Sequence, residues 1–342
     1  MKLCIKIVIH IATALVAMSC VHKELCYNHR EHAHRYHVNV IADYRYDWEE
    51  NYGGHDWSVQ WPEHYIPYDD LRPTKPSGLR VVNYKDEQGY NVHNISADGG
   101  VVNLYEGENN ILFYNNDTEY ILFSRHQEGN RATTRATTRT KTRATYVGNK
   151  YGNEDEETMT PPDMLYANYW DTYIPEKVLD PTPLEITLQP LVFKYKVRYE
   201  FAEGLEYVAI ARGALSGMAK SVLMDTGDTS AESATILYDC DLTDYGARAL
   251  VTSFGIPDFP NINYPTRVPA RNSLNLELLL KNGKLVTLDF DVTEQVQKQP
   301  HGGVIVVDGI VIKKEDGISG SGAFDVDVND WGEYEDVVLP LM

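Results

Sequence analysis

The stretch GVVNLYEGENNILFYNNDTEYILF, residues 100–123, decides the fold of this chain. It holds three short runs of β-branched and aromatic residues, and turn-forming pieces such as NNDT separate them. The same pattern precedes it in the runs HVNVIADY and LRVVNY. Strands that recur every ten to twelve residues or so are typical of a β-sandwich. The sequence therefore predicts an N-terminal β-sandwich over residues 36–160.

The second half of the chain also alternates with the period of a strand. In LEITLQ the even-numbered residues 184–188 are apolar, whereas in LVFKYKVRY the odd-numbered residues 191–199 are apolar or aromatic. Because a slip of one residue exchanges the two faces of a strand, we expect a bulge or a break at Pro190. Downstream, SLNLELLLKNGKLVTLDFDV predicts a hairpin that turns at Asn282-Gly283, with positive φ at both residues.

Composition changes between these two halves. An acidic run at 154–157 is followed by Pro161-Pro162 and by three prolines between 175 and 183, which oppose regular structure. We expect a junction at 161–182 and a C-terminal β-sandwich at 183–342. No convincing amphipathic helix of three turns is present, so the predicted fold is all-β, with two sandwich domains in tandem.

The first twenty residues, MKLCIKIVIHIATALVAMSC, have the basic start and short apolar run of a secretory signal, which we place at 1–19. VAMSC resembles a bacterial lipobox, although Ala17 stands where leucine is usual. We therefore expect lipidation (palmitate) of Cys20; the alternative is an ordinary signal cleaved near Ala17 or Ser19. Residues 20–35 would then be a lipid-anchored tether, and the membrane would be contacted only through lipid.

Charge and cysteine content limit the function further. The chain has 31 basic and 50 acidic residues and a net charge of −19, which argues against nucleic acid as a partner. With Cys4 removed and Cys20 lipidated, Cys26 and Cys240 remain in a compartment that permits disulfides. They either form a bridge or remain two buried thiols.

The sequence has no recognisable motif of catalysis or metal binding. GISGSG at 317–322 lacks the second glycine of a serine nucleophile elbow. DVDVNDWGEYED at 325–336 has aspartate where a calcium loop needs glycine, and a strand with one wet face explains its alternation. The histidines of the tether have no ligand set of recognised spacing around them. We predict a non-enzyme without a metal or a cofactor.

An aromatic segment exceeds the background, with eight tyrosines and tryptophans between residues 44 and 68. Exposed rings such as Trp48, Trp57, Trp61 and Tyr65 can stack on sugars or anchor a protein partner. The segment can equally be a long loop that folds over an open end of the sandwich.

A basic ladder, RATTRATTRTKTRAT at 131–145, has all five cations at odd positions. An extended chain would place them on one face. We expect a mobile loop that becomes a strand at 139–148. One interpretation of the ladder is a solvated linker near the acidic run. The other is a sheet edge or a protease-sensitive loop at Arg131, Arg135 and Arg139.

Several pieces taken in order resemble the fimbrillin-like lipoproteins of Bacteroidales, with the closest likeness to their anchor or accessory group. The pieces are the lipobox cysteine, KELCYNH, DYRYDW, NILFYNNDTEYILF, PPDMLYA, ITLQPLVFKYKV, LSGMAKSVLM and FDVDVNDW. The resemblance implies two transthyretin-like β-sandwich domains and a lipid anchor in the outer membrane. It also implies other fimbrial subunits or surface proteins as partners, joined by β-strand addition.

Two details follow from the same resemblance. Shaft subunits are trimmed by an arginine-specific protease after the first strand, and Arg45 and Arg72 occupy that place here. Val21-His22-Lys23 replaces the usual acidic residues after the lipidated cysteine, so the periplasmic or cell-surface face stays open. The alternative function is a glycan-binding outer-membrane lipoprotein that uses the aromatic loop.

Overall fold

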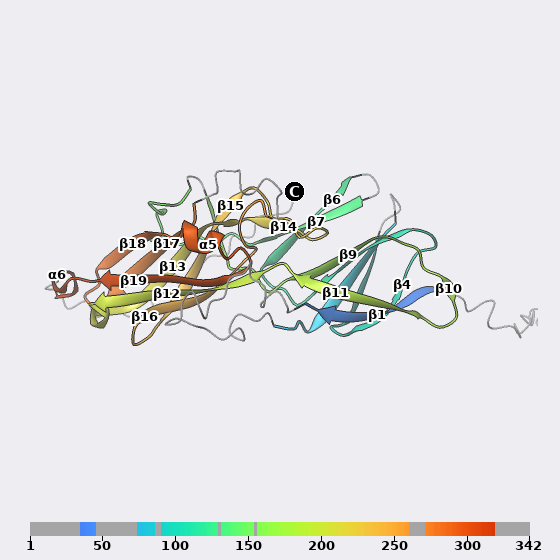
Figure 1. Cartoon of the computed structure of the whole chain (residues 1–342), viewed down its shortest axis with the longest axis horizontal. Helices are drawn as coiled ribbons and strands as arrows, with labels where there is room; N and C mark the ends of the chain where they lie inside the picture. The colour runs from blue at the N-terminus through green and yellow to red at the C-terminus, as the bar shows by residue number, and fades with distance from the viewer. Residues whose placement is uncertain are drawn as a thin grey trace, which may run out of the picture.

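The computed structural model describes residues 35–45, 74–85, 90–128, 131–153, 156–259 and 271–318. Nearly every element in these ranges is a strand, which confirms the predicted all-β class. The molecule is elongated, with a barrel at one end, a half-barrel at the other and a small sheet between them (Figure 1). Among the described residues, no helix has the length and apolar character needed to cross a bilayer.

In the described part of the chain, seven strands form the barrel, and an eighth short strand joins it at β1. Their order is β1 (Arg35–Tyr44), β11 (Thr182–Pro190), β9 (Tyr166–Tyr173), β5 (Asn109–Asn115), β2 (Gly78–Tyr84), β3 (Tyr90–Ser96) and β4 (Gly99–Asn103), with β10 (Lys177–Val178) beside β1. The barrel closes because β4 also pairs with β1, while β1 and β11 run parallel. Closure is tight at Gly99, where an added Cβ would lie 1.9 Å from the carbonyl oxygen of Val40. Only glycine fits there, and its φ is +121°.

The half-barrel is an open sheet. Its order is β18 (Leu285–Asp291), β17 (Ser273–Leu280), β13 (Val208–Ala219), β15 (Ser233–Leu242), β16 (Gly246–Ser253), β12 (Phe193–Glu203) and β19 (Gly303–Val311), with β8 (Glu157–Met159) beside β15. Among the described residues, three short helical pieces accompany it: η3 (Leu205–Tyr207), α5 (Thr293–Gln297) and α6 (Lys314–Ile318). Its concave face holds the largest core, which includes Tyr195, Tyr199 and Leu276.

The chain passes from barrel to half-barrel at the break predicted near Pro190. In β11, Leu184, Ile186 and Leu188 point into the barrel core, and the strand ends at Pro190. Residues 191–192 are buried between the two units, and the odd positions of β12 then face the half-barrel core. The break is therefore confirmed. β11 itself pairs with β1 and β9 of the barrel, and the predicted limits of the domains stay a prediction.

A three-stranded sheet lies between the two units. It consists of β6 (Ile121–Glu128), β7 (Arg131–Thr138) and β14 (Ser221–Leu223). Its residues Ala136 and Val222 share a buried cluster with Leu112 and Tyr114 from the outside of the barrel and with Phe254 from the half-barrel side. Apolar burial thus holds the barrel and the half-barrel together.

The predicted hairpin exists, with a different turn. Leu280 donates its N–H to Lys284 O at 2.9 Å, and Gly283 donates to Leu280 O at 2.8 Å. Gly283 has positive φ (81°), and Asn282 does not. Thr172 and Asp258 are the described non-glycine residues with positive φ. The loop therefore has three residues with the left-handed position at glycine, instead of the expected two-residue turn.

Candidate sheet-edge interface

Most of the residues predicted as sites lie outside the described ranges. These are the lipidation residue, one cysteine of the bridge and the four aromatic residues of the recognition loop: Cys20, Cys26, Trp48, Trp57, Trp61 and Tyr65. Lipidation, the disulfide and the aromatic recognition surface therefore stay predictions.

Cys240 lies on β15, packed against the half-barrel core, and has no disulfide partner among the described residues. Burial raises the pKa of the Cys240 thiol well above its ordinary value, and the negative charge of Asp239 adds to this effect. The thiol is therefore protonated at neutral pH and chemically quiet.

The basic ladder is a strand first and an irregular segment afterwards, so the expected order of loop and then strand was wrong. β7 pairs with β6 on one side and with β14 on the other. Within β7, Thr134, Ala136 and Thr138 are buried while Arg135 is half-buried, which fits the parity of an extended chain. Arg135 donates to Ser221 Oγ at 2.9 Å, and the guanidinium of Arg139 lies 5.8 Å from the centre of the Tyr120 ring.

Arg143 departs from the solvated role expected for the ladder. Its side chain is buried on the convex face of the half-barrel, where it pairs with Glu277 and donates to the carbonyl oxygen of Gly213 at 3.2 Å. Thr145 donates to the same carboxylate at 3.0 Å. The segment after β7 is thus fastened across β13, β15 and β17. Sequence reasoning missed this role, because the residue continues the odd-numbered row of cations.

The half-barrel has two outer strands, β18 and β19, and they differ in how their backbone groups are satisfied. An outer strand presents unpaired N–H and C=O groups that can pair with another chain. On β19 the side chain of Gln299 donates to Val304 O at 2.8 Å and accepts from Val304 N–H at 2.7 Å. Gln295 does the same with Val306, and both distances are 2.9 Å. The outer edge of β19 is therefore occupied by two side-chain amides.

The edge of β18 is open within the described part of the chain, where β18 pairs only with β17. The Leu280–Lys284 hydrogen bond fixes the alternation, because hydrogen-bonded and non-hydrogen-bonded pairs follow each other along an antiparallel ladder. The N–H and C=O groups of Leu285, Thr287, Asp289 and Asp291 consequently point away from β17. Sequence reasoning did not distinguish the two edges, because glutamines at 295 and 299 carry no signal of a strand-like role.

Two pockets are also lined by described residues. One, of about 430 Å³, lies where barrel and half-barrel meet; Arg45 and Gln189 line it on one side, and Phe193, Phe259 and His301 on the other. The His301 ring stacks on Phe193 at 4.6 Å and meets Phe259 edge-on at 5.1 Å. Burial lowers the pKa of His301 from 6.5 to about 4, so the ring is neutral at pH 7.

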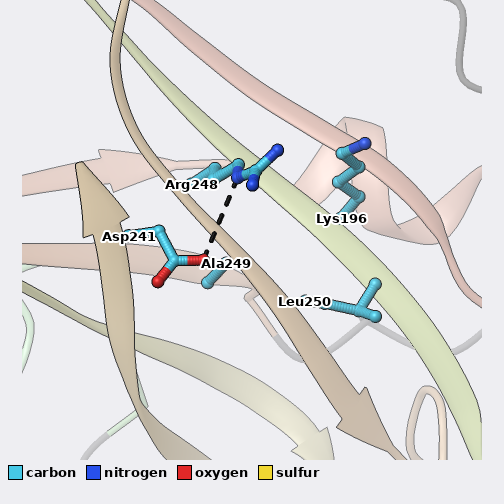
Figure 2. A pocket seen from close by; sticks show the side chains of 5 residues that line it. All are labelled: Lys196, Asp241, Arg248, Ala249 and Leu250. Atoms are coloured by element: carbon cyan, nitrogen blue, oxygen red, sulfur yellow. Dashed lines mark ion pairs between the residues drawn. The ribbon is translucent and has the colours of Figure 1, made fainter. Parts of the chain in front are cut away.

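The second pocket, of about 250 Å³, lies on the convex face over β12 and β16. Figure 2 shows Lys196 and Leu250 beside it and Arg248 directed at Asp241, with Nε and Oδ2 3.9 Å apart. Lys194, Lys196 and Arg198 alternate with core residues along β12, so they share this face. Within the described ranges, no cluster of three His, Cys, Asp or Glu residues is suited to a metal ion.

Comparison with known proteins gives several similar proteins. A relative described as "Putative fimbrium anchoring subunit Fim4B", from Bacteroides ovatus, is 25% identical over 319 residues, which cover 84% of this chain and 91% of the relative. A crystal structure of "a putative adhesin" from the same species has a TM-score of 0.52 and 21% identity, and the match covers 82% of this chain and 94% of that one. "The fimbrial anchor protein Mfa2 from Porphyromonas gingivalis" matches with 12% identity and a TM-score of 0.40, over 80% and 90% of the two chains.

The relative described as a fimbrium anchoring subunit confirms the resemblance to the fimbrillin-like family and to its anchor or accessory group. The solved adhesin structure shows that the fold is shared. A family model matches residues 68–239, which span most of the barrel, the small sheet and the first strands of the half-barrel. The chain therefore belongs to the family described as "Domain of unknown function (DUF5119)".

Proposed function

We propose that this chain is a non-catalytic, lipid-anchored component of a fimbria-like surface assembly, as an anchor, accessory subunit or adhesin. The observation that carries the proposal is the relative described as a fimbrium anchoring subunit, because the match extends over 91% of its length. Lipidation of Cys20 would hold the chain in the outer membrane, and its partners would be other fimbrial subunits. Two tandem transthyretin-like domains are part of the same proposal.

The subunits would be joined by β-strand addition. The open edge of β18 supports this mechanism, because its outward N–H and C=O groups can form a ladder with an incoming strand. Burial of apolar side chains along the joint would add to the main-chain hydrogen bonds.

The proposal is tested by crosslinking the full chain in cells that produce it and identifying the crosslinked proteins by mass spectrometry. We expect β-rich fimbrial subunits, and we expect a palmitate analogue to label the parent but not Cys20→Ala. Deleting the terminal segment FDVDVNDW, 324–331, should reduce the capture of subunits. Crosslinks confined to proteins of nutrient uptake, with no fimbrial subunit, would contradict the proposal.

The glycan-binding alternative is favoured by one observation, the junction pocket. Aromatic rings line it, and so does Arg45, the second residue of the aromatic segment. Rings of this kind stack on sugar faces. If the alternative is correct, Trp57→Ala with Trp61→Ala should abolish retention on a glycan array, and unchanged retention would remove it.

A further inference from the structure

We propose that the half-barrel accepts an added strand at β18 and not at β19, and that the accepted strand alternates apolar residues with basic or hydroxyl-bearing ones. The occupant is an extended segment of another protein with that pattern. This inference rests on the proposed function, since it names the edge and the partner chemistry of strand addition.

Helix α5 and the turn after it act as a substitute strand along β19. Gln295 lies in α5 and Gln299 in the turn after it, and their amides meet Val304 and Val306, which are about 6.6 Å apart along a strand. Each amide offers one acceptor and one donor, as a peptide group does. Val296 is fully buried in the half-barrel core and holds the helix in place. An incoming strand would have to break four hydrogen bonds to reach this edge.

The β18 edge offers what β19 lacks. Val286, Leu288 and Phe290 pack against the half-barrel core but are only partly buried. An apolar residue at every second position of an added strand would cover these side chains from the open side. The outward backbone groups of β18 would supply the ladder.

Charge on the other face of β18 selects among strands. Asp289 and Asp291 lie on this face, next to Thr287. Like charges placed opposite each other on neighbouring strands are destabilising, and opposite charges are favourable. The chain's own terminal segment FDVDVNDW, 324–331, has suitable apolar residues but carries aspartate between them. β18 should therefore reject this segment and accept a counterpart that carries lysine.

Two labelled peptides test the selection by fluorescence anisotropy with the purified full chain. One is AFDVDVNDWG, residues 323–332, and the other is the same peptide with Asp325→Lys and Asp327→Lys, the two aspartates that alternate with Phe324, Val326 and Val328. We expect the lysine peptide to bind at least tenfold more tightly at low salt, and the difference to shrink as salt screens the charges. Equal binding, or tighter binding of the aspartate peptide, would overturn the charge selection.

The edge is tested with Thr287→Pro and its matched control Thr287→Ala. The Thr287 N–H points outward, so proline removes no bond to β17 but blocks an incoming strand. We expect the lysine peptide to lose at least tenfold in affinity for Thr287→Pro and nothing for Thr287→Ala. If Thr287→Pro does not fold, Asp289→Asn with Asp291→Asn replaces it and should bring the affinities of the two peptides together. Unchanged binding in these variants would overturn the assignment to β18.

The closed edge is tested with Gln295→Leu and Gln299→Leu combined. Removing both amides exposes the backbone of β19 beside the basic row of β12, so we expect the aspartate peptide to gain at least fivefold in affinity. The control is Gln297→Leu on the same helix, where the amide nitrogen has no hydrogen-bond partner among the described residues. No gain in the double variant would overturn the role of α5. Peptide binding at β18 without crosslinks to fimbrial subunits would contradict the proposed function alone. Crosslinks to fimbrial subunits without peptide binding at β18 would contradict this inference alone.

Discussion

Arg143 and Glu277 form an ion pair in which Nε and Oε2 are 3.0 Å apart and the side chains are 3% and 1% exposed. The pair joins the segment after β7 to β17 on the convex face of the half-barrel. Without that segment, polar residues such as Asn275 and Ser216 would face solvent; with it, they are buried. The ion pair therefore fastens the cover that gives the half-barrel a second buried face.

Arg143→Met should lower the free energy of unfolding by about 3–5 kcal/mol, because it leaves the Glu277 carboxylate buried without its partner. Urea denaturation followed by circular dichroism measures the change. The double variant Arg143→Met with Glu277→Leu should recover part of the loss, since it removes both charges. Arg135→Met, at a half-buried position of β7, should cost about 1 kcal/mol or less. A parent-like Arg143→Met would show that the pair contributes nothing.

The alternation of apolar residues was enough to predict the all-β class and the break at Pro190. Local periodicity determines which face of a strand is buried, and the changed parity at residues 184–199 has one simple structural solution. The Asn282-Gly283 hairpin was predictable for the same reason, although its turn type was not. Local patterns of this kind need no knowledge of which strands pair.

The strand partners could not be predicted from the same patterns. Closure of the barrel depends on β1 meeting both β4 and the distant β11, and nothing in HVNVIADY specifies a parallel partner 144 residues away, the separation of Val38 from Thr182. The edge closure by Gln295 and Gln299 depends on how α5 packs, and Arg143 differs from the other ladder cations only in what lies beneath it. Long-range packing decides each of these features, and the local pattern of a single sequence does not reveal that packing.

Gly213→Ala should destabilise the half-barrel, because an added Cβ would lie 2.2 Å from the ring of Tyr238. That ring is fixed by burial and by a hydrogen bond between the hydroxyls of Tyr238 and Tyr199 at 2.8 Å. We expect a loss of about 2–3 kcal/mol from overpacking, measured by thermal and urea unfolding. Tyr238→Val added to Gly213→Ala should cost less than the sum of the two single changes. Strict additivity would contradict the predicted contact.

Stability should fall in mild acid because of His301. Its pKa is lowered by burial to about 4 from an ordinary 6.5, so the folded protein binds fewer protons than the unfolded chain between these values. The contribution of neutral His301 to the free energy of unfolding is complete above about pH 6.5. It is lost as the pH falls toward 4, and its magnitude is on the order of 3 kcal/mol. His301→Phe keeps a ring against Phe193 and should flatten the dependence in this window. An unchanged pH profile in that variant would exclude His301 as the cause.

Cys240 should react slowly with iodoacetamide in the folded protein at pH 8, because its pKa is raised by burial and the thiolate is the reactive form. In urea the reaction should become fast. Mass spectrometry of the alkylated peptide measures both rates. A thiol that stays unreactive in urea until a reductant is added would instead support the bridge to Cys26.

Native trypsin should spare Arg135, although it lies in a sequence of closely spaced basic residues. Its backbone is paired with Ser124 of β6 and with Leu223 of β14, and a protease needs an extended chain free of both neighbours. Arg143 should also be spared because its side chain is buried. Limited digestion with timed mass spectrometry identifies the first cuts, and Arg143→Met should expose Arg139 and Lys141 to cleavage by loosening the segment that follows β7. Early cleavage after Arg135 in the parent would contradict the pairing of β7 on both sides.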